Sequence, residues 1–505
     1  MRVLFIYPNL YAQVGFNYGI AFLSAMLKKR GHAISLLNIN EKIGYPLDLD
    51  RIRKDIENYN PGIIGFSAVT NQFQYVIEIA QMIKRHFTIP IVCGGIHATI
   101  TPEEVLNSGY FDYLCVGEGE HALLELVEKL EKGENTSSIA NIWLKQNSKI
   151  IKNKVRPFVN LNSLPPKDYK IFNFQQMIDA KNGWVGIMSS RGCPFKCSYC
   201  FNHQMVKIYK TDLKVSTKKL HYIRHHHCES VIEELSTLLN DYNNIRMFIF
   251  DDDLFTLNKE YLSSFCREYT KKINKPFVVN GHIKFFDDEI AHMLKEAGCE
   301  IVKFGLESGS ERIRKEVLFR PMKNSEIIKA FEVAHKYGLH TTAFVIFGLP
   351  YETEEDLLMT IKLLAYIKPG RFRWSIFFPY TNTAAYEISK KGGLIDFEKM
   401  RSLSNFTEES CLNFGEQHNL WIKKLQKVLP WYVNAYTDLP SSSLYLTLIQ
   451  EIKQMDAKTW DEAKTKFFSW DESISQLLSI NQKEHYAIKY NEFMAVHSNW
   501  FQKKD

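Results

Sequence analysis

Two runs of short apolar strands alternating with helical patterns limit most strongly how this chain of 505 residues can fold. In the first run, strands are predicted at residues 3–7, 33–39, 63–67, 91–93 and 113–116. Short strands separated by amphipathic helices favour a parallel sheet with helices on both faces. We therefore expect a doubly wound, Rossmann-like α/β domain over residues 1–134, whose ligand lies beyond the carboxyl ends of the strands.

The second run begins after residues 135–180, which we expect to be a linker that contains a hairpin near 139–155. Its strands are predicted at residues 184–189, 246–250, 277–280, 301–304, 341–347 and 372–378. Six βα units predict a partial (β/α)6 barrel over residues 181–396 rather than a complete eight-stranded one. Residues 397–505 show mainly helical patterns and are expected to form an accessory α domain.

The composition of the chain limits which substrates it can bind and where in the cell it is expected. The net charge of +6 is small for this length, and Lys and Arg are scattered, which favours a small-molecule or natural-product-like substrate over a nucleic acid. The first residues lack a signal-peptide pattern, and no apolar stretch is long enough to span a bilayer, so a cytoplasmic location is expected. Nine cysteines in such a chain indicate metal chemistry rather than disulfides.

Three cysteines, Cys193, Cys197 and Cys200, form a CxxxCxxC motif directly after the first strand of the second run. Thiolates are the usual ligands of Fe–S clusters, and three of them would leave one iron of a [4Fe-4S] cluster without a protein ligand. The alternative is a structural zinc site completed by His203 or a distant cysteine. Zinc motifs usually pair two CxxC-type units, which favours the cluster.

With Tyr199 before its last cysteine, the motif resembles that of the radical S-adenosylmethionine (SAM) superfamily. The resemblance implies a [4Fe-4S] cluster whose open iron binds SAM. It also implies cleavage of SAM to a 5′-deoxyadenosyl radical, which removes hydrogen from unactivated C–H bonds. The electron would come from an external donor such as flavodoxin or ferredoxin. In such enzymes the cofactor supplies the difficult chemistry and the protein orients it.

Three further segments resemble the SAM-binding motifs of this superfamily. Asp251, Asp252 and Asp253 resemble an acidic variant of the motif that holds the methionine ammonium, although a Mg²⁺ or Ca²⁺ site or a helix cap is the alternative for them. Spacing does not decide which aspartate acts. The other two segments provide Glu307 with Ser308 for the ribose and carboxylate, and Ile346 with Gly348 and Glu352 for the adenine.

The first of these two segments has an alternative interpretation, and the second departs from the family pattern at one position. The segment around Glu307 also reads as a helix start, with Ser310 as the capping residue. In the adenine segment, Phe344 replaces the leading glycine of the family's GxIxGxxxE pattern, so that match is partial.

The N-terminal domain resembles the cobalamin-binding domain that precedes the barrel in cobalamin-dependent radical SAM proteins. Small residues after three of its strands would let a flat ligand approach the backbone. The residues implied as cobalamin-binding are Ser67, Val69, Thr70, Gly94, Gly95, Glu118 and Gly119.

One departure puts cobalamin in question, because the loop after the first strand contains no histidine to ligate the lower face of cobalt. The domain would otherwise be a scaffold without cobalamin. His97 is expected either near the cofactor edge or in a surface loop. The histidine-rich run over residues 221–228 is interpreted as a solvated basic loop, with a second metal site as the alternative.

Together these motifs resemble the class B methyltransferases and the anaerobic tetrapyrrole cyclases of the radical SAM superfamily. We therefore expect a cobalamin-dependent radical SAM enzyme that methylates an unactivated carbon. Cyclisation or ring rearrangement without methyl transfer is the nearest alternative. A non-catalytic Fe–S or zinc protein is the alternative from a different class.

Overall fold

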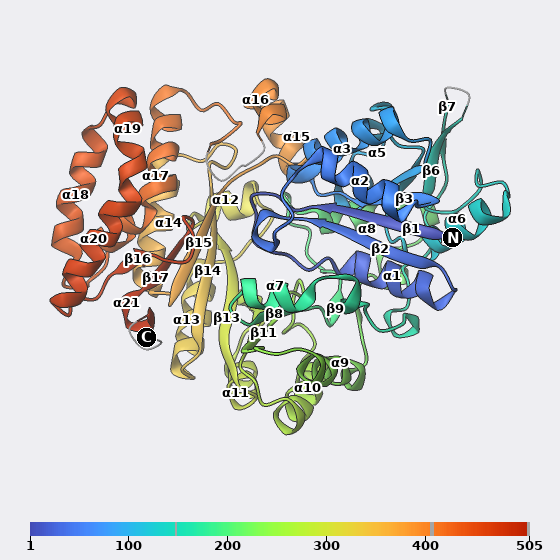
Figure 1. Ribbon diagram of the computed structural model, residues 1–505. Helices are drawn as coiled ribbons and strands as arrows, with labels where there is room; N and C mark the ends of the chain where they lie inside the picture. The colour runs from blue at the N-terminus through green and yellow to red at the C-terminus, as the bar shows by residue number, and fades with distance from the viewer. Residues whose placement is uncertain (147–148, 404–408, 502–505) are drawn as a thin grey trace. The chain divides into compact units, whose positions relative to one another are not determined.

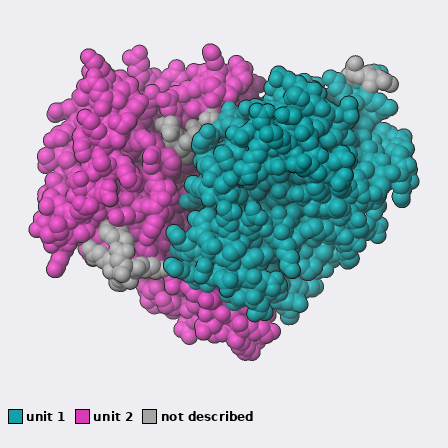
Figure 2. All heavy atoms as spheres, viewed as in Figure 1, with its two compact units in different colours: residues 1–195, 200–253, 380–382 teal, residues 196–199, 254–379, 383–505 magenta. Residues whose placement is uncertain are grey.

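The computed structural model describes residues 1–146, 149–403 and 409–501. These residues form two compact units (Figure 2). Unit 1 comprises residues 1–195, 200–253 and 380–382, and unit 2 comprises residues 196–199, 254–379 and 383–505. Each unit is described separately below.

The first sheet of unit 1 has the strand order β2-β1-β3-β4-β5-β6-β7. Its first five strands are parallel to one another, and the order of connection reverses between β1 and β3, because the chain goes from β1 to β2 on one side and then to β3 on the other. Such a reversal is where doubly wound folds bind ligands. The strands are β1 (Arg2–Pro8), β2 (Ala33–Ile39), β3 (Ile63–Ser67), β4 (Ile91–Gly94) and β5 (Tyr113–Cys115).

Helices connect these strands and cover both faces of the sheet, with α2 (Leu49–Tyr59) beside α3 (Phe73–His86) and α1 (Tyr18–Lys29) beside α6 (Glu120–Lys132) (Figure 1). The expected Rossmann-like domain is thereby confirmed. Helix α1 begins where the Asn17 side chain accepts a hydrogen bond from the Ile20 amide, and α2 is capped in the same way by Asp48.

The predicted hairpin is present as β6 (Ile142–Gln146) and β7 (Lys149–Lys152), which are antiparallel and extend the first sheet. The rest of unit 1 contains the start of the second run. Strand β8 (Trp184–Ile187) pairs in parallel with β11 (Met247–Phe250), and β9 (Ser190–Arg191) pairs with β10 (Arg224–His225). The remaining helices here are α4 (Ile96–Ile100), α5 (Pro102–Asn107), α7 (Phe174–Ala180), α8 (Phe201–Leu213) and α9 (Cys228–Asp241).

Unit 2 continues the second run with four parallel strands, so all six strands expected for the partial barrel are present. These are β12 (Phe277–Gly281), β13 (Cys299–Glu307), β14 (His340–Phe347) and β15 (Arg371–Ile376). Their side chains are buried almost throughout, as expected for parallel strands covered by helices. The connecting helices are α10 (Lys259–Lys272), α11 (Asp288–Glu296), α12 (Glu311–Glu316), α13 (Asn324–Lys336) and α14 (Glu354–Ile367).

The C-terminal region is mostly helical, as expected, and α17 packs against α14 and α18 (Figure 1). Two strands that the pattern did not predict, β16 (Tyr486–Ile488) and β17 (Met494–His497), extend the sheet at β15 in antiparallel order. Among the residues described, no helix has the length and hydrophobicity needed to cross a membrane. The helices of this region are α15 (Ala384–Lys391), α16 (Phe397–Ser402), α17 (Glu416–Ala435), α18 (Ser442–Gln454), α19 (Ala457–Ala463), α20 (Phe467–Ile480) and α21 (Ser498–Phe501).

Candidate cofactor sites

A cavity of about 490 Å³ opens in unit 1 beyond the carboxyl ends of the first sheet's strands. This volume is within the range of small-molecule and cofactor sites. Five of the seven residues implied as cobalamin-binding line the cavity together, whereas Val69 and Thr70 are not among its described lining residues. The five are Ser67, Gly94, Gly95, Glu118 and Gly119.

The two consecutive glycines at the end of β4 differ in whether the fold requires glycine. Gly95 has φ +94°, and a Cβ there would lie 2.6 Å from the backbone of Ala68, so the fold itself requires glycine. A Cβ on Gly94 would meet only ordinary contacts, the nearest being Cys115 Cβ at 3.6 Å. The backbone therefore does not require glycine at position 94. The absence of a side chain there keeps the cavity wall flat, and a flat wall suits a flat ligand.

Glu118 is engaged in an ion network of unit 1. Its carboxylate accepts hydrogen bonds from Arg191 at 3.0 Å, from Arg224 at 2.7 Å and from the Val159 amide at 2.8 Å. Burial opposes ionisation, but these donors outweigh it and lower the pKa of Glu118 below its usual value. The carboxylate therefore joins the loop after β5 to β9 and β10 at the cavity wall.

The loop after β1 brings Asn17 and Tyr18 to the same cavity. Asn17 donates a hydrogen bond to Ser67 Oγ at 3.1 Å, which ties this loop to the end of β3. His97 is buried, so it does not lie in a surface loop, and its neighbours Ile96 and Thr99 line the cavity. Its ring contacts Phe73 and lies 3.3 Å from Thr70 Oγ1, and burial lowers its pKa to about 4.

The three consecutive aspartates after β11 have different surroundings. Asp252 is fully buried, and its carboxylate accepts hydrogen bonds from the Ser189 amide and from the hydroxyls of Ser189 and Ser190. Burial raises the pKa of Asp252 despite these donors. This side chain therefore holds the segment that leads into the cysteine motif.

Asp251 and Asp253, by contrast, both line the cavity. Asp251 accepts a hydrogen bond from the Tyr18 hydroxyl at 2.8 Å, and Asp253 accepts one from Asn202 Nδ2 at 3.0 Å. None of the three caps the following helix, because Asn258 caps α10. Two carboxylates, those of Asp251 and Asp253, thus lie at the cavity wall.

The three motif cysteines follow β9. Cys197 is buried, whereas Cys193 and Cys200 are partly exposed, and all three are free of disulfides. Cys197 Sγ accepts a hydrogen bond from Arg320 Nη1 at 3.5 Å, a contact of the kind that tunes Fe–S clusters. No three His, Cys, Asp or Glu side chains are gathered as a metal site in the described part of the chain. Ligation by these cysteines therefore stays a prediction.

In unit 2, the end of β13 carries the residue implied to contact SAM. Glu307 has φ +65°, a conformation uncommon for residues other than glycine, and the pairing of β13 with β14 is irregular there. Tyr199 donates to Glu307 Oε1 at 3.0 Å. Burial raises the pKa of Glu307, while Arg320 and this hydrogen bond oppose the rise. Strain of this kind is often found at functional sites.

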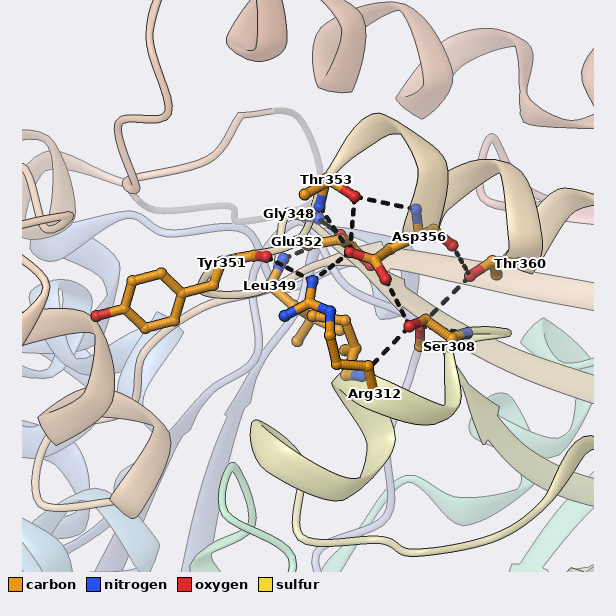
Figure 3. Close-up of polar contacts among 11 residues, drawn as sticks. Ser308, Arg312, Gly348, Leu349, Tyr351, Glu352, Thr353, Asp356 and Thr360 are labelled. Carbon is orange, nitrogen blue, oxygen red and sulfur yellow. Dashed lines mark hydrogen bonds and ion pairs between the residues drawn. The ribbon is translucent and has the colours of Figure 1, made fainter.

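The segment after β14 turns at Gly348, whose φ of +72° suits glycine. Glu352 Oε2 accepts hydrogen bonds from the amides of Gly348 at 2.7 Å and Leu349 at 3.1 Å, which fixes the turn implied to face the adenine (Figure 3). Glu352 is buried, and burial raises its pKa to about 8. Its second oxygen has no hydrogen-bond partner among the described residues.

Ser308 lies beside this turn and is fully buried, with its hydroxyl 3.4 Å from Thr360 Oγ1 (Figure 3). Ser310 caps α12, as the plainer reading of its segment expects, by accepting from the Ile313 amide. Ile346 and Tyr199 both pack against a cluster of buried apolar residues around Ile313.

The histidine-rich run is more ordered than the solvated loop that we expected. Arg224 and His225 form β10, and the ring of His226 stacks on Phe22. Burial, together with Lys167 and Arg191, lowers the pKa of His226 to about 3. His227 precedes α9 as its capping position.

Sequence reasoning missed several residues now seen at these sites. Tyr18 and Asn202 reach Asp251 and Asp253 from helices, and Arg320 reaches Cys197 across 123 positions of the chain. The only available signal for Arg320 was a basic residue in the loop after a short predicted helix, which is too common to be informative.

Comparison with known proteins gives two domain matches and a set of relatives. Residues 10–127 match the B12 binding domain, and residues 187–364 match the Radical SAM superfamily. The chain is 28% identical to "Uncharacterized methyltransferase PH0819" of Pyrococcus horikoshii, over 81% of this chain and 89% of that protein. It is 25% identical to "Anaerobic magnesium-protoporphyrin IX monomethyl ester cyclase" of Rubrivivax gelatinosus, over 82% and 75% of the two chains.

Solved structures share the fold at lower identity. The cobalamin-dependent S-adenosylmethionine radical enzyme OxsB superposes with a TM-score of 0.66 at 16% identity, covering 95% of this chain and 75% of its own. The radical S-adenosylmethionine methyltransferase TsrM of Kitasatospora setae gives 0.62 at 19% identity, covering 77% and 76%. The two-domain order of the chain thus recurs in proteins of known fold.

Proposed function

We propose that this chain, a radical SAM protein with an N-terminal cobalamin-binding domain, methylates an unactivated carbon of a small-molecule substrate. Its cofactors are a [4Fe-4S] cluster, SAM and cobalamin. When bound, the cluster with SAM supplies a 5′-deoxyadenosyl radical, and cobalamin supplies a transferable methyl group. A methyltransferase among the relatives supports methylation.

The observation that carries the proposal is the unit 1 cavity, in which cobalamin-type and SAM-type residues meet. Its wall includes Ser67 and Gly94 at the ends of β3 and β4, Gly119 after β5, and Asp251 and Asp253 after β11. The flat glycine wall suits a corrin ring. The two carboxylates suit the ammonium of SAM, because a charge-assisted hydrogen bond is stronger than a neutral one.

We further propose ligand roles for residues outside that cavity. Cys193, Cys197 and Cys200 would hold the cluster, and Glu307 with Ser308 would contact the ribose and carboxylate of SAM. Ile346 and Gly348 would border the adenine, with Glu352 holding their turn. Ile346 and Tyr199 pack against an apolar cluster, which would exclude water from their side of the bound cofactor.

A second candidate function is cyclisation or rearrangement without methyl transfer, favoured by the similarity to a cyclase of 25% identity. Product analysis separates the two. The full chain would be purified anaerobically with hydroxocobalamin, reconstituted with iron and sulfide, and given SAM, a reductant and candidate substrates. Methylation predicts S-adenosylhomocysteine and 5′-deoxyadenosine in equal amounts with a methylated product. Formation of 5′-deoxyadenosine alone, with a cyclised product, would replace the proposal by the alternative.

A further inference from the structure

Arg320 occupies a position that no cofactor motif explains. It lies in the loop between α12 and α13, and its guanidinium points at the cysteine motif rather than at solvent, with Nη1 3.5 Å from Cys197 Sγ. Nη2 donates to the Gly305 carbonyl at 2.9 Å. Its side-chain hydrogen bonds in the described part of the chain therefore go to a sulfur and a carbonyl, which leaves the positive charge without a bonded carboxylate.

The surrounding structure holds this contact in place from both sides. Ser198 donates from its amide to the Leu318 carbonyl at 3.0 Å, and from its hydroxyl to the Val317 carbonyl. The Arg320 amide donates to the Arg314 carbonyl at 2.7 Å. The loop that carries Arg320 is therefore tied to the residue next to Cys197, so the guanidinium and the sulfur are positioned by the same set of bonds.

The space for the guanidinium is made by a glycine. A Cβ on Gly305 would lie 3.2 Å from Arg320 Nη2 and 2.3 Å from Glu307 Oε1. The Nε atom of Arg320 is buried and has no hydrogen-bond partner among the described residues. A buried donor without a partner is costly, so an acceptor is expected beside Nε. Because Cys197 is predicted to ligate iron, an anionic acceptor such as a cluster sulfide would explain this donor.

We propose that Arg320 sets the reduction potential of the [4Fe-4S] cluster through its hydrogen bond and charge at Cys197, acting as a positioning and tuning residue. The inference rests on the proposed function, because it requires the three cysteines to hold that cluster. Reduction adds one electron, and therefore one negative charge, to the cluster. A guanidinium in hydrogen-bond contact with a ligand sulfur stabilises the reduced form more than the oxidised form, so it raises the potential.

Besides Cys197, the titratable groups that interact with Arg320 include Glu307, Tyr199, Arg314 and His282. Of these, the Glu307 carboxylate accepts a hydrogen bond from the Tyr199 hydroxyl at 3.0 Å. Arg314 uses its guanidinium for the Met322 and Ser308 carbonyls and for Asn324. Neither therefore replaces the N–H···S contact that Arg320 makes with Cys197.

The test is a reductive titration of the reconstituted full chain without SAM, followed by electron paramagnetic resonance of the reduced cluster. Omitting SAM ensures that any effect on the potential is independent of SAM binding. Arg320→Gln removes the charge, and Arg320→Lys retains it. Arg312→Gln is the matched control, because it removes the same charge from α12, while Arg312 contacts Asp356 and the Tyr351 carbonyl instead of a cysteine (Figure 3).

We expect Arg320→Gln to lower the equilibrium constant for one-electron reduction at least tenfold, which corresponds to about 59 mV. The equilibrium constant of Arg320→Lys should stay within tenfold of the wild-type value, and that of Arg312→Gln should equal the wild-type value. Arg320→Gln with four irons and the wild-type midpoint would overturn the inference. So would an unchanged midpoint accompanied by weaker SAM binding, which would make Arg320 a SAM contact instead.

Iron and sulfide content is measured first for every variant, together with circular dichroism. If Arg320→Gln folds but holds no cluster, Arg320→Lys still decides the question. An equilibrium constant for reduction of Arg320→Lys that differs more than tenfold from the wild type contradicts a role for the charge. A wild-type chain that never acquires four irons and four sulfides would instead remove the proposed function itself. The two failures are therefore distinguishable.

Discussion

The hydroxyl of Tyr199 donates a hydrogen bond to Glu307 Oε1 at 3.0 Å, which connects the cysteine motif to the strained end of β13. If Glu307 contacts SAM, this bond fixes the orientation of its carboxylate. We expect Tyr199→Phe to weaken SAM binding by about tenfold or more, since a hydrogen bond to a charged group contributes about 1.5–3 kcal/mol and each ~1.4 kcal/mol is about tenfold in affinity. Anaerobic equilibrium dialysis measures this, with unchanged iron content as the control. Wild-type affinity in Tyr199→Phe would remove the role of this bond.

Cluster ligation is tested by removing the cysteines singly. Replacement of Cys193, Cys197 or Cys200 by Ala should abolish the broad visible absorption of the reconstituted cluster and lower the iron content well below four per chain. Cys266→Ala is the control, because Cys266 is a buried cysteine of α10 outside the motif. Retention of a full cluster by any of the three motif variants would contradict its role as a ligand.

Substitutions of the consecutive aspartates should have different effects, with Asp252 affecting mainly stability and Asp253 mainly SAM binding. Asp252→Ala leaves the Ser189 amide and two serine hydroxyls without their acceptor, so we expect it to lower the free energy of unfolding by about 1–3 kcal/mol. Asp253→Ala should cost less stability and weaken SAM binding more. Urea denaturation and anaerobic SAM binding measure the two effects. Equal destabilisation by both substitutions would contradict this division.

Cobalamin binding is tested at the flat wall of the cavity. Gly94→Val places a side chain where the backbone tolerates a Cβ, so the fold should persist while the corrin absorption after purification with hydroxocobalamin is lost. Ala33→Val is the control, because Ala33 is an exposed residue of β2 that is not among the described residues lining the cavity. A Gly94→Val protein with full corrin absorption would exclude this wall as the cobalamin site.

Glu352 should make stability depend on pH. Its folded pKa of about 8 lies above the ordinary value of 4.5, so the folded chain binds more protons than the unfolded chain between these values. Stability from this group is therefore complete below about pH 4.5 and is lost as pH rises through 8. Relative to Glu352→Gln, the wild type should lose on the order of 1 kcal/mol or more between pH 5 and 9. Parallel stability curves for the two proteins would contradict the shift.

The sequence allowed the two strand–helix series to be predicted closely, because their local signals agree with the fold. The helix Glu354–Ile367, for example, begins at a capping box in which Thr353 and Asp356 exchange hydrogen bonds. Strands β16 and β17 were missed because they have three and four residues and are buried on both faces, so no alternation marks them.

The division of labour among the aspartates could not be predicted in the same way. Adjacent residues leave a strand in different directions, and only the fold shows that Asp252 faces Ser189 while its two neighbours face the cavity. The contact between Arg320 and Cys197 depends on packing between segments distant in sequence. Motif spacing contains no information on such contacts.

The most direct test of the account is SAM cleavage by the anaerobically reconstituted full chain. The wild type is incubated with SAM and a reductant, either titanium(III) citrate or a reduced flavodoxin, and 5′-deoxyadenosine is quantified. Cys197→Ala, carried through the same reconstitution, is the matched control. The account predicts that the wild type forms 5′-deoxyadenosine and that Cys197→Ala forms none above background. A wild-type protein loaded with four irons that forms no 5′-deoxyadenosine with either reductant would contradict it.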